Sequence, residues 1–398
     1  MTLPALPRGF RVAGVHCGIK KDPAKEDLSL FVADRPAVAV GVYTQNLVFA
    51  APVAVDRMRT PLEAARVVVV NSGNANACTG ERGLADAHEM CRLAATAVGA
   101  TPNQALVMST GVIGVFLPMD RVGNGIAAAA SRLAADESAF LAAARGILTT
   151  DRGPKVAGRT VTADGRTYQL TGICKGAAMI GPRMATMLCI VMTDAGLDVP
   201  TAQRLLAEAV EDSFNCISVE GHMSTNDTVL LLASGEAGSI AAEGAGREAF
   251  RQALRDLCRE LARMIPDDGE GSTHLVSIHV QGCRTRDEAR QVAKTVAESA
   301  LVKTAITGAD PNWGRIVSAA GYSGVAIDPH HLTLRVNGHL LFRDGSPVPF
   351  DAALVSASIR NQRETLVDLQ LEEGEAAAWY WTSDLTAEYV RLNSEYTT

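Results

Sequence analysis

An uninterrupted apolar run is the strongest constraint on this fold: residues 187–192 read Met-Leu-Cys-Ile-Val-Met and end at Thr193. The run has the right length for a fully buried β-strand and is too short for a helix with caps. A Gly-Pro pair at residues 181–182 marks a turn just before it. Thr186 therefore stands at the start of a buried strand, immediately after the small residue Ala185.

Short β-branched runs alternate with helical patterns along the rest of the chain, which at 398 residues is too long for one ordinary core. We therefore expect an α/β fold of layered sheets and helices. Further strands are expected at residues 38–43, 67–70, 105–108, 160–161, 168–173, 229–233, 275–280, 332–336, 365–371 and 377–382. Helices are expected at residues 84–98, 119–133, 137–148, 200–213, 248–264 and 286–299.

Composition excludes several classes of function. The net charge of −7 argues against nucleic acid as a main partner, although local basic patches around a small acidic substrate are compatible with it. The amino terminus has no secretory pattern, and no segment reaches the roughly 18 uncharged apolar residues of a membrane helix. We expect a cytoplasmic protein without a membrane partner. The eight cysteines show no zinc spacing, and no phosphate-binding loop occurs, so we expect neither a metal nor a cofactor.

Thr186 is the first candidate for chemistry. A threonine hydroxyl alone is a poor nucleophile, but cleavage of the Ala185–Thr186 bond would give the residue a free α-amine. Such an amine has a reference pKa of about 7.7 to 8.0, so it can act as the general base for the hydroxyl beside it. From these residues alone, a threonine that simply begins a strand is the commoner alternative.

Three further positions could serve the same site. Ser109-Thr110-Gly111 follows a predicted strand, where a tight turn either presents backbone N–H groups to a developing negative charge or only connects two elements. Lys175 ends another strand, where it could hold a substrate carboxylate, could lower the pKa of the new amine, or could be an ordinary solvated lysine. Glu270 lies between two glycines, so its carboxylate either binds a substrate amine or belongs to an acidic surface turn.

Together with these positions, motifs along the whole chain have an order and spacing that resemble the ornithine acetyltransferase family. That family is also called glutamate N-acetyltransferase, or the bifunctional arginine-biosynthesis acetyltransferase. Each motif alone is weak, but their combination is specific. They lie at residues 7–10 (Pro-Arg-Gly-Phe), 71–77 (Asn-Ser-Gly-Asn-Ala-Asn-Ala), 109–114 (Ser-Thr-Gly-Val-Ile-Gly), 149–151 (Thr-Thr-Asp), 175–176, 184–188 (Met-Ala-Thr-Met-Leu), 224–228 (Ser-Thr-Asn-Asp-Thr), 268–271 (Asp-Gly-Glu-Gly), 310–315 (Asp-Pro-Asn-Trp-Gly-Arg) and 393–398 (Asn-Ser-Glu-Tyr-Thr-Thr).

The resemblance implies an α-β-β-α-like sandwich with a smaller C-terminal α/β lobe, autocleaved between Ala185 and Thr186 into an α chain (1–185) and a β chain (186–398). It implies that acetyl moves from N-acetylornithine to Thr186 and then to glutamate, in arginine biosynthesis. Some members also accept acetyl-CoA as donor, and two αβ units associate as α2β2. The oxyanion hole would be formed by Thr110 and Gly111. The substrate-binding residues would be Thr149, Lys175, Thr186, Glu270, Asn393 and Thr398.

The chain departs from the family's usual sequence in two places. Residues 220–223 read Glu-Gly-His-Met instead of Asp-Gly-Asp-Thr, and residues 271–274 read Gly-Ser-Thr-His instead of Gly-Ala-Thr-Lys. Both changes alter charge or size close to the expected site, so they bear on specificity. His222 and His274 are either local titrating groups or ordinary polar replacements in a loop.

Two rival functions are compatible with the same residues. An acetylated Thr186 that water intercepts would make the protein an N-terminal-threonine amidohydrolase or aminopeptidase. A chain that has kept the fold without cleavage would be a binding protein.

Overall fold

The computed structural model describes residues 3–163, 165–181, 187–241 and 243–395. Within these residues the strands form two sheets. The first has the order β4-β3-β2-β9-β7-β6-β5, with β1 paired to β2. Its strands are β1 (Phe10–Val15), β2 (Leu28–Tyr43), β3 (Leu62–Asn74), β4 (Ala105–Val112), β5 (Lys155–Ala163), β6 (Arg166–Lys175), β7 (Leu188–Thr193) and β9 (Thr228–Ala233).

The first sheet forms two layers, and strand β2 takes part in both. One layer contains β1, β3 and β4, and the other contains β9, β7, β6 and β5. The first part of β2, through Ala33, pairs with β1 and β3, whereas its second part, from Val38 to Tyr43, pairs with β9 and keeps only Ala39 paired with β3. An irregularity in register between Val32 and Ala37 separates the two parts, and such bulges bend and twist a strand. The sequence pattern predicted only the second part of this strand, because the exposed Asp34-Arg35-Pro36 segment interrupts the apolar run.

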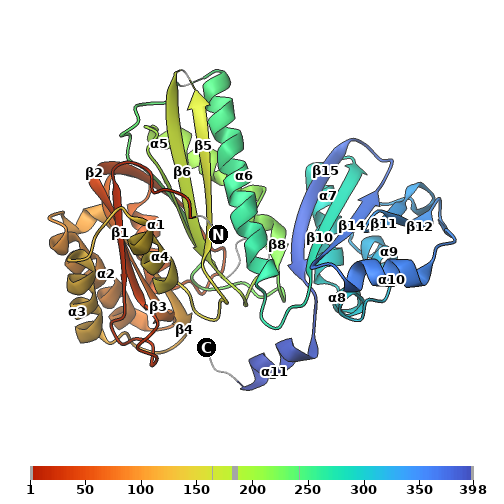
Figure 1. Ribbon diagram of the computed structural model, residues 1–398, viewed down its shortest axis with the longest axis horizontal. Helices are drawn as coiled ribbons and strands as arrows, with labels where there is room; N and C mark the ends of the chain where they lie inside the picture. Colours follow the sequence, from red (N-terminus) through yellow and green to blue (C-terminus); the bar gives the residue numbers. More distant parts are fainter. Residues whose placement is uncertain (1–2, 164, 182–186, 242, 396–398) are drawn as a thin grey trace.

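The two layers pack their inner faces together and carry helices outside. The inner core combines Phe31, Val70 and Met108 of one layer with Ile190 and Leu230 of the other, together with α4 (Glu137–Gly146). One outer face is covered by α1 (Ala51–Arg59), α2 (Gly80–Ala97) and α3 (Met119–Ala130), and the other by α5 (Val199–Glu211) and α6 (Ala245–Asp267) (Figure 1). The expected α/β layering is confirmed.

Strand β7 is the buried strand predicted from residues 187–192. It pairs antiparallel with β6 and parallel with β9, and all six of its residues are buried. Its side chains alternate between the two cores, with Ile190 in the inner core and Val191 facing α5 and α6. The expected boundary between residues 185 and 186 therefore divides one sheet, and not two separately folded lobes.

The second sheet forms the smaller C-terminal lobe, in the order β13-β12-β11-β14-β10-β15-β8. Its strands are β8 (Ile217–Ser218), β10 (Leu275–Cys283), β11 (Thr333–Val336), β12 (His339–Arg343), β13 (Ser346–Pro347), β14 (Glu364–Gln370) and β15 (Ala376–Ser383). Helices α7 (Arg286–Glu298), α8 (Ala300–Thr307), α9 (Trp313–Gly321) and α10 (Ala352–Arg360) pack around them. The final helix, α11 (Ala387–Glu395), runs from this lobe back toward the first (Figure 1). No helix in the described ranges is long and apolar enough to span a membrane.

Candidate active site

The expected cleavage position lies between β6 and β7. Lys175 is the last residue of β6 and pairs with Leu188, the first residue of β7. Ala185 and Thr186 fall outside the described residues, as does Thr398. Met187, the residue that follows Thr186, donates its backbone N–H to Asp227 Oδ1 at 3.0 Å. Its carbonyl accepts the N–H of Thr228 at 3.2 Å. The start of the expected β chain is therefore held against residues 227–228.

Asp227 is a buried carboxyl group at the entrance to β9. Burial raises its pKa to about 7, because a charged carboxylate loses its hydration there, and the hydrogen bond from Met187 only partly offsets this. The adjacent Asn226 donates from Nδ2 to the carbonyls of Ser109 (2.8 Å) and Ala75 (2.7 Å). Asn226 and Asp227 therefore connect the end of β4 to the start of β7.

The tight turn predicted after Ser109 is wrong, because β4 continues to Val112 and Gly111 lies inside it, paired with Gly73 of β3. Gly111 has a φ of +133°, and a Cβ added there would lie 2.3 Å from the carbonyl carbon of Gly73. A side chain at this position is excluded by both conformation and space. Thr110 is buried beside it. The residues expected to form the oxyanion hole thus lie in the close-packed last part of β4, and Asn226, the neighbour of Asp227, bonds the carbonyl of Ser109 just before them.

A buried charge cluster surrounds Lys175, whose side chain is 2% exposed. Asp151 Oδ1 accepts hydrogen bonds from Lys155 Nζ and from the N–H of Gly176, both at 2.7 Å. Its Oδ2 accepts the N–H of Thr149 at 3.1 Å. Burial works to raise the pKa of Asp151, but the Lys155 and Lys175 cations hold it well below its usual range. Thr149 is thereby fixed close to Lys175.

Lys175 itself carries a lowered pKa. Burial disfavours its ammonium form, while the nearby carboxylates of Asp151, Asp227 and Glu270 act in the opposite direction. A desolvated cation among carboxylates is suited to bind the carboxylate of a small substrate, because that contact would replace lost hydration.

Glu270 reaches this cluster from the second lobe. Its backbone N–H donates to the carbonyl of Ala177 at 3.0 Å, so residues 269–272 lie against the segment that follows Lys175. Its Oε2 accepts a hydrogen bond from Asn393 Nδ2 at 3.1 Å, which brings α11 to the site. The tail residue Asn393 and the loop residue Glu270 are therefore neighbours, although 123 positions separate them.

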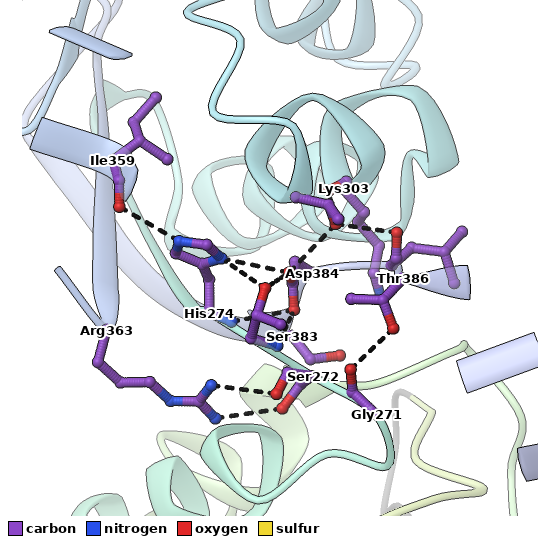
Figure 2. A network of polar contacts seen from close by, with 12 residues as sticks. Gly271, Ser272, His274, Lys303, Ile359, Arg363, Ser383, Asp384 and Thr386 are labelled. Carbon is purple, nitrogen blue, oxygen red and sulfur yellow. Dashed lines mark hydrogen bonds and ion pairs between the residues drawn. The ribbon is translucent and has the colours of Figure 1, made fainter. Parts of the chain in front are cut away.

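His274 anchors the loop that carries Glu270. Its ring Nδ1 lies 3.2 Å from Asp384 Oδ2, and its Nε2 lies 3.2 Å from the carbonyl oxygen of Ile359 (Figure 2). Both ring nitrogens thus lie within hydrogen-bond distance of oxygen atoms on other parts of the lobe. Arg363 bonds Ser272, and Thr386 bonds the carbonyl of Gly271 (Figure 2).

The other departure from the family pattern contains a buried carboxyl group, Glu220. Its Oε1 accepts the N–H of Ile180 at 2.6 Å, and the carbonyl of Ile180 accepts the N–H groups of Val219 (2.9 Å) and Gly221 (3.0 Å). Burial raises the pKa of Glu220 to about 8. Residues 219–221 therefore hold the segment that leads to the expected cleavage position.

The structure groups the described candidates around one end of the first sheet. Gly111 and Thr149 line a single cavity of about 450 Å³, Lys175 joins Thr149 through Asp151, and Glu270 joins Asn393. The roles assigned to them stay predictions. The sequence reasoning gave no role to Asp151, Glu220, Asn226 or Asp227. The one available signal was the presence of acidic and amide residues directly beside apolar strand runs.

Comparison with known proteins shows what the chain resembles. The ArgJ family model matches residues 11–398. The "Arginine biosynthesis bifunctional protein ArgJ" of Rhodopirellula baltica is 48% identical, covering 100% of this chain and 97% of that protein. Its counterpart from Symbiobacterium thermophilum is 46% identical over 98% of each chain. The crystal structure of arginine biosynthesis bifunctional protein ArgJ from Bacillus halodurans is 36% identical, with a TM-score of 0.51, and covers 52% of this chain and 98% of its own.

Proposed function

Because this chain belongs to the ArgJ family, as its motifs led us to expect, we propose that it is an acetyltransferase of arginine biosynthesis. It cleaves itself between Ala185 and Thr186, accepts acetyl from N-acetylornithine on Thr186 and passes it to glutamate. The observation that carries the proposal is the hydrogen bond from Met187 to Asp227, because it holds the residue that follows Thr186 against a carboxyl group that acts on the buried Lys175.

The position of the cut supports a protein that stays assembled after cleavage. Strand β7 is held by β6 of the α chain on one side and by β9 of the β chain on the other. Breaking one peptide bond before it leaves these ladders intact. The matched chain of the Bacillus halodurans structure is about half as long as this one, which fits a protein that matures into two similar pieces. We propose α2β2 assembly in the cytoplasm.

In the first half of the reaction, the Thr186 hydroxyl oxygen bonds to the acetyl carbonyl carbon of N-acetylornithine, and the α-amine of Thr186 takes the hydroxyl proton. The negative oxygen of the tetrahedral intermediate faces the N–H groups of Thr110 and Gly111. The carbon–nitrogen bond then breaks, and the proton leaves with the ornithine amine. Acetyl-Thr186 remains.

In the second half, the glutamate amine attacks the acetyl ester. The ester carbon–oxygen bond breaks, the oxygen of Thr186 regains a proton from the attacking nitrogen through the α-amine, and N-acetylglutamate leaves. Lys175 binds a substrate carboxylate, and Glu270, oriented by Asn393, binds a substrate ammonium group. Thr149 and Thr398 complete the proposed substrate contacts. None of these steps calls for a metal or a cofactor.

An exchange assay tests the proposal. Purified protein with N-acetylornithine and glutamate should release ornithine and N-acetylglutamate in equal amounts. Without glutamate, ornithine release should stop after about one equivalent per site, because the acetyl group has no acceptor. Acetate formed at the same rate with and without glutamate would establish the amidohydrolase alternative instead.

A further inference from the structure

A buried lysine without a role in the proposed reaction links two carboxylates beside the candidate site. Lys155 is the first residue of β5 and pairs with Cys174, which directly precedes Lys175. The Nζ of Lys155 donates to Asp151 Oδ1 at 2.7 Å and to Asp268 Oδ2 at 2.5 Å. The side chain of Lys155 is 5% exposed. Lys155 therefore forms an ion-pair bridge between the first sheet and the loop that follows α6.

The first end of this bridge is fixed beside Lys175. Asp151 accepts the backbone N–H of Gly176, the residue after Lys175, and the backbone N–H of Thr149. The side chain of Asp151 is completely buried, and the cations of Lys155 and Lys175 both act on it. The Asp151 carboxylate is thus held in one place relative to the strand that ends at Lys175.

The second end of the bridge carries Glu270. Asp268 lies at the end of α6, where its backbone N–H bonds the carbonyl of Met264 at 3.1 Å. Its carboxylate also accepts the backbone N–H (3.0 Å) and the Nε (2.7 Å) of Arg152. Glu270 follows two residues later and donates its backbone N–H to the carbonyl of Ala177 at 3.0 Å. The short loop with Glu270 is therefore held at two points against residues that flank Lys175 in the sequence.

Burial makes the Lys155 bridge the stronger of the ion pairs at Asp268. Burial acts to lower the pKa of Lys155, but the carboxylates of Asp151 and Asp268 outweigh it and raise the pKa, so the ammonium form persists. Opposite charges attract more strongly away from water, and a buried pair is costly to break by removal of one partner. The Arg152 side chain is 60% exposed, so its pair with Asp268 contributes less.

The proposed donor has two charges that this frame can match. In N-acetylornithine a carboxylate and an ammonium group are separated by the Cα atom and three methylene groups. Under the proposed function, Lys175 binds the carboxylate and Glu270 binds the ammonium group. The distance between these two protein groups then decides which chain length satisfies both contacts. A donor with one methylene group fewer or more would fit only one of them well, and such a difference changes kcat/KM by about tenfold or more.

We propose that Lys155 is a positioning residue that fixes the spacing between Lys175 and Glu270, and that this spacing selects a donor with the chain length of ornithine. The inference rests on the proposed function for the roles of these two binding groups. Lys155 acts only through Asp151 and Asp268 and does not touch the substrate. Loss of the bridge should therefore change the preference among chain lengths, whereas a purely structural defect would lower the activity with every donor by the same factor.

Lys155→Met, which keeps the apolar stem and removes the bridge, tests this inference. The donors are the α-N-acetyl derivatives of diaminobutyrate, ornithine and lysine, with glutamate as acceptor. In the unmodified protein we expect kcat/KM for the ornithine derivative to exceed the other two values by about tenfold or more. In Lys155→Met, and in Asp268→Asn, we expect this ratio to fall below about threefold, because the two binding groups are no longer held at one spacing. Asp268→Asn alone decides the question if Lys155→Met does not fold.

Two further variants separate positioning from stability. Lys155→Arg keeps a cation between the two carboxylates and should recover part of the preference. Arg159→Met is the matched control, because it removes another ion pair between β5 and α6, with Glu260, and leaves the loop of Glu270 untouched. It should keep the full preference for the ornithine derivative.

Calorimetric binding of free diaminobutyrate, ornithine and lysine makes the test independent of acetyl transfer. Tighter binding of ornithine that is lost in Lys155→Met and Asp268→Asn, in a protein that transfers no acetyl group, would refute the proposed function and leave the spacing intact. Transfer from N-acetylornithine with similar kcat/KM for all three donors would refute the spacing and leave the proposed function intact. A preference that survives in both folded variants would also overturn the role of Lys155.

Discussion

Asp227 accepts through Oδ1 the backbone N–H of Met187 at 3.0 Å, and this bond joins the entrance of β9 to the residue that follows Thr186. The bond does not depend on the peptide link between Ala185 and Thr186, so it can hold Met187 in place before and after the proposed cleavage. We therefore propose Asp227 as a positioning residue for Thr186. Its buried carboxyl group, with a pKa of about 7, also makes the protein sensitive to pH near neutrality.

Asp227→Asn should change how stability depends on pH. In the native protein the carboxyl group keeps its proton up to about pH 7, whereas in the unfolded chain it loses the proton near pH 4. Its contribution is therefore fully present below pH 4 and is lost as the pH rises toward 7. Over this range we expect the free energy of unfolding of the variant to rise relative to that of the unmodified protein, by up to about 4 kcal/mol at pH 8. Thermal unfolding from pH 4 to 8 measures this, with the exposed Asp22→Asn as control; parallel curves would contradict it.

Gly111→Ala should abolish activity. The new methyl group would overlap the backbone of Gly73 and displace the N–H groups of Thr110 and Gly111 in β4. Because the loss of one oxyanion donor costs about 10²–10³ in kcat, we expect at least a hundredfold decrease in acetyl exchange. Gly114→Ala also has a positive φ, but no atom lies within 4 Å of the added Cβ. It should lose only about 1 kcal/mol of stability and keep its activity. Equal losses of activity in both variants would indicate that backbone strain, and not overlap with Gly73, is the cause.

Lys175→Met should lower the exchange activity without lowering the stability of the fold. Burial lowers the pKa of Lys175, so removal of its charge relieves a cost to the fold, and Asp151 keeps Lys155 as its partner. We expect an unchanged or slightly higher Tm and a loss of exchange activity of about a hundredfold, because a desolvated carboxylate contact is lost. Lys155→Met removes an ion-pair partner of both Asp151 and Asp268 from a buried position and should lower Tm instead. Full activity in Lys175→Met would exclude the residue from the site.

The sequence specified the sheet better than it specified the site. The apolar run before Thr193 predicts a strand buried on both faces, and the structure confirms this strand as β7. The tight turn predicted at residues 109–111 was wrong, because β4 continues through Gly111 to Val112 by pairing with β3, and that pairing joins residues far apart in the sequence. The contacts of Asp227 with Met187 and of Asn393 with Glu270 could not be predicted either, because each joins residues at least 40 positions apart through tertiary packing. Such a contact leaves no periodic pattern in the sequence around either residue.

His274→Ala should act on substrate binding through Glu270. Without the ring, the contacts to Asp384 and Ile359 are lost, and the loop that presents Glu270 loosens. We expect KM for the amino-acid substrates to rise about tenfold, with a smaller change in kcat, because the role proposed for Glu270 is substrate binding and not bond breaking. His274→Lys, which can still donate to Asp384, should recover most of the loss. The control is His331→Ala, which replaces an exposed histidine. Equal increases in KM in both variants would show that the loop carrying Glu270 is not responsible.

The central claim is that Thr186 becomes an amino-terminal residue and carries the acetyl group. The most direct measurement is the intact mass of the purified protein after brief mixing with N-acetylornithine in the absence of glutamate. We predict two chains, 1–185 and 186–398, with about 42 Da added to the second chain on Thr186 and removed when glutamate is supplied. Thr186→Ala should give one uncut, inactive chain. An unbroken chain that still exchanges acetyl groups, or an acetyl group found on another residue, would contradict the account.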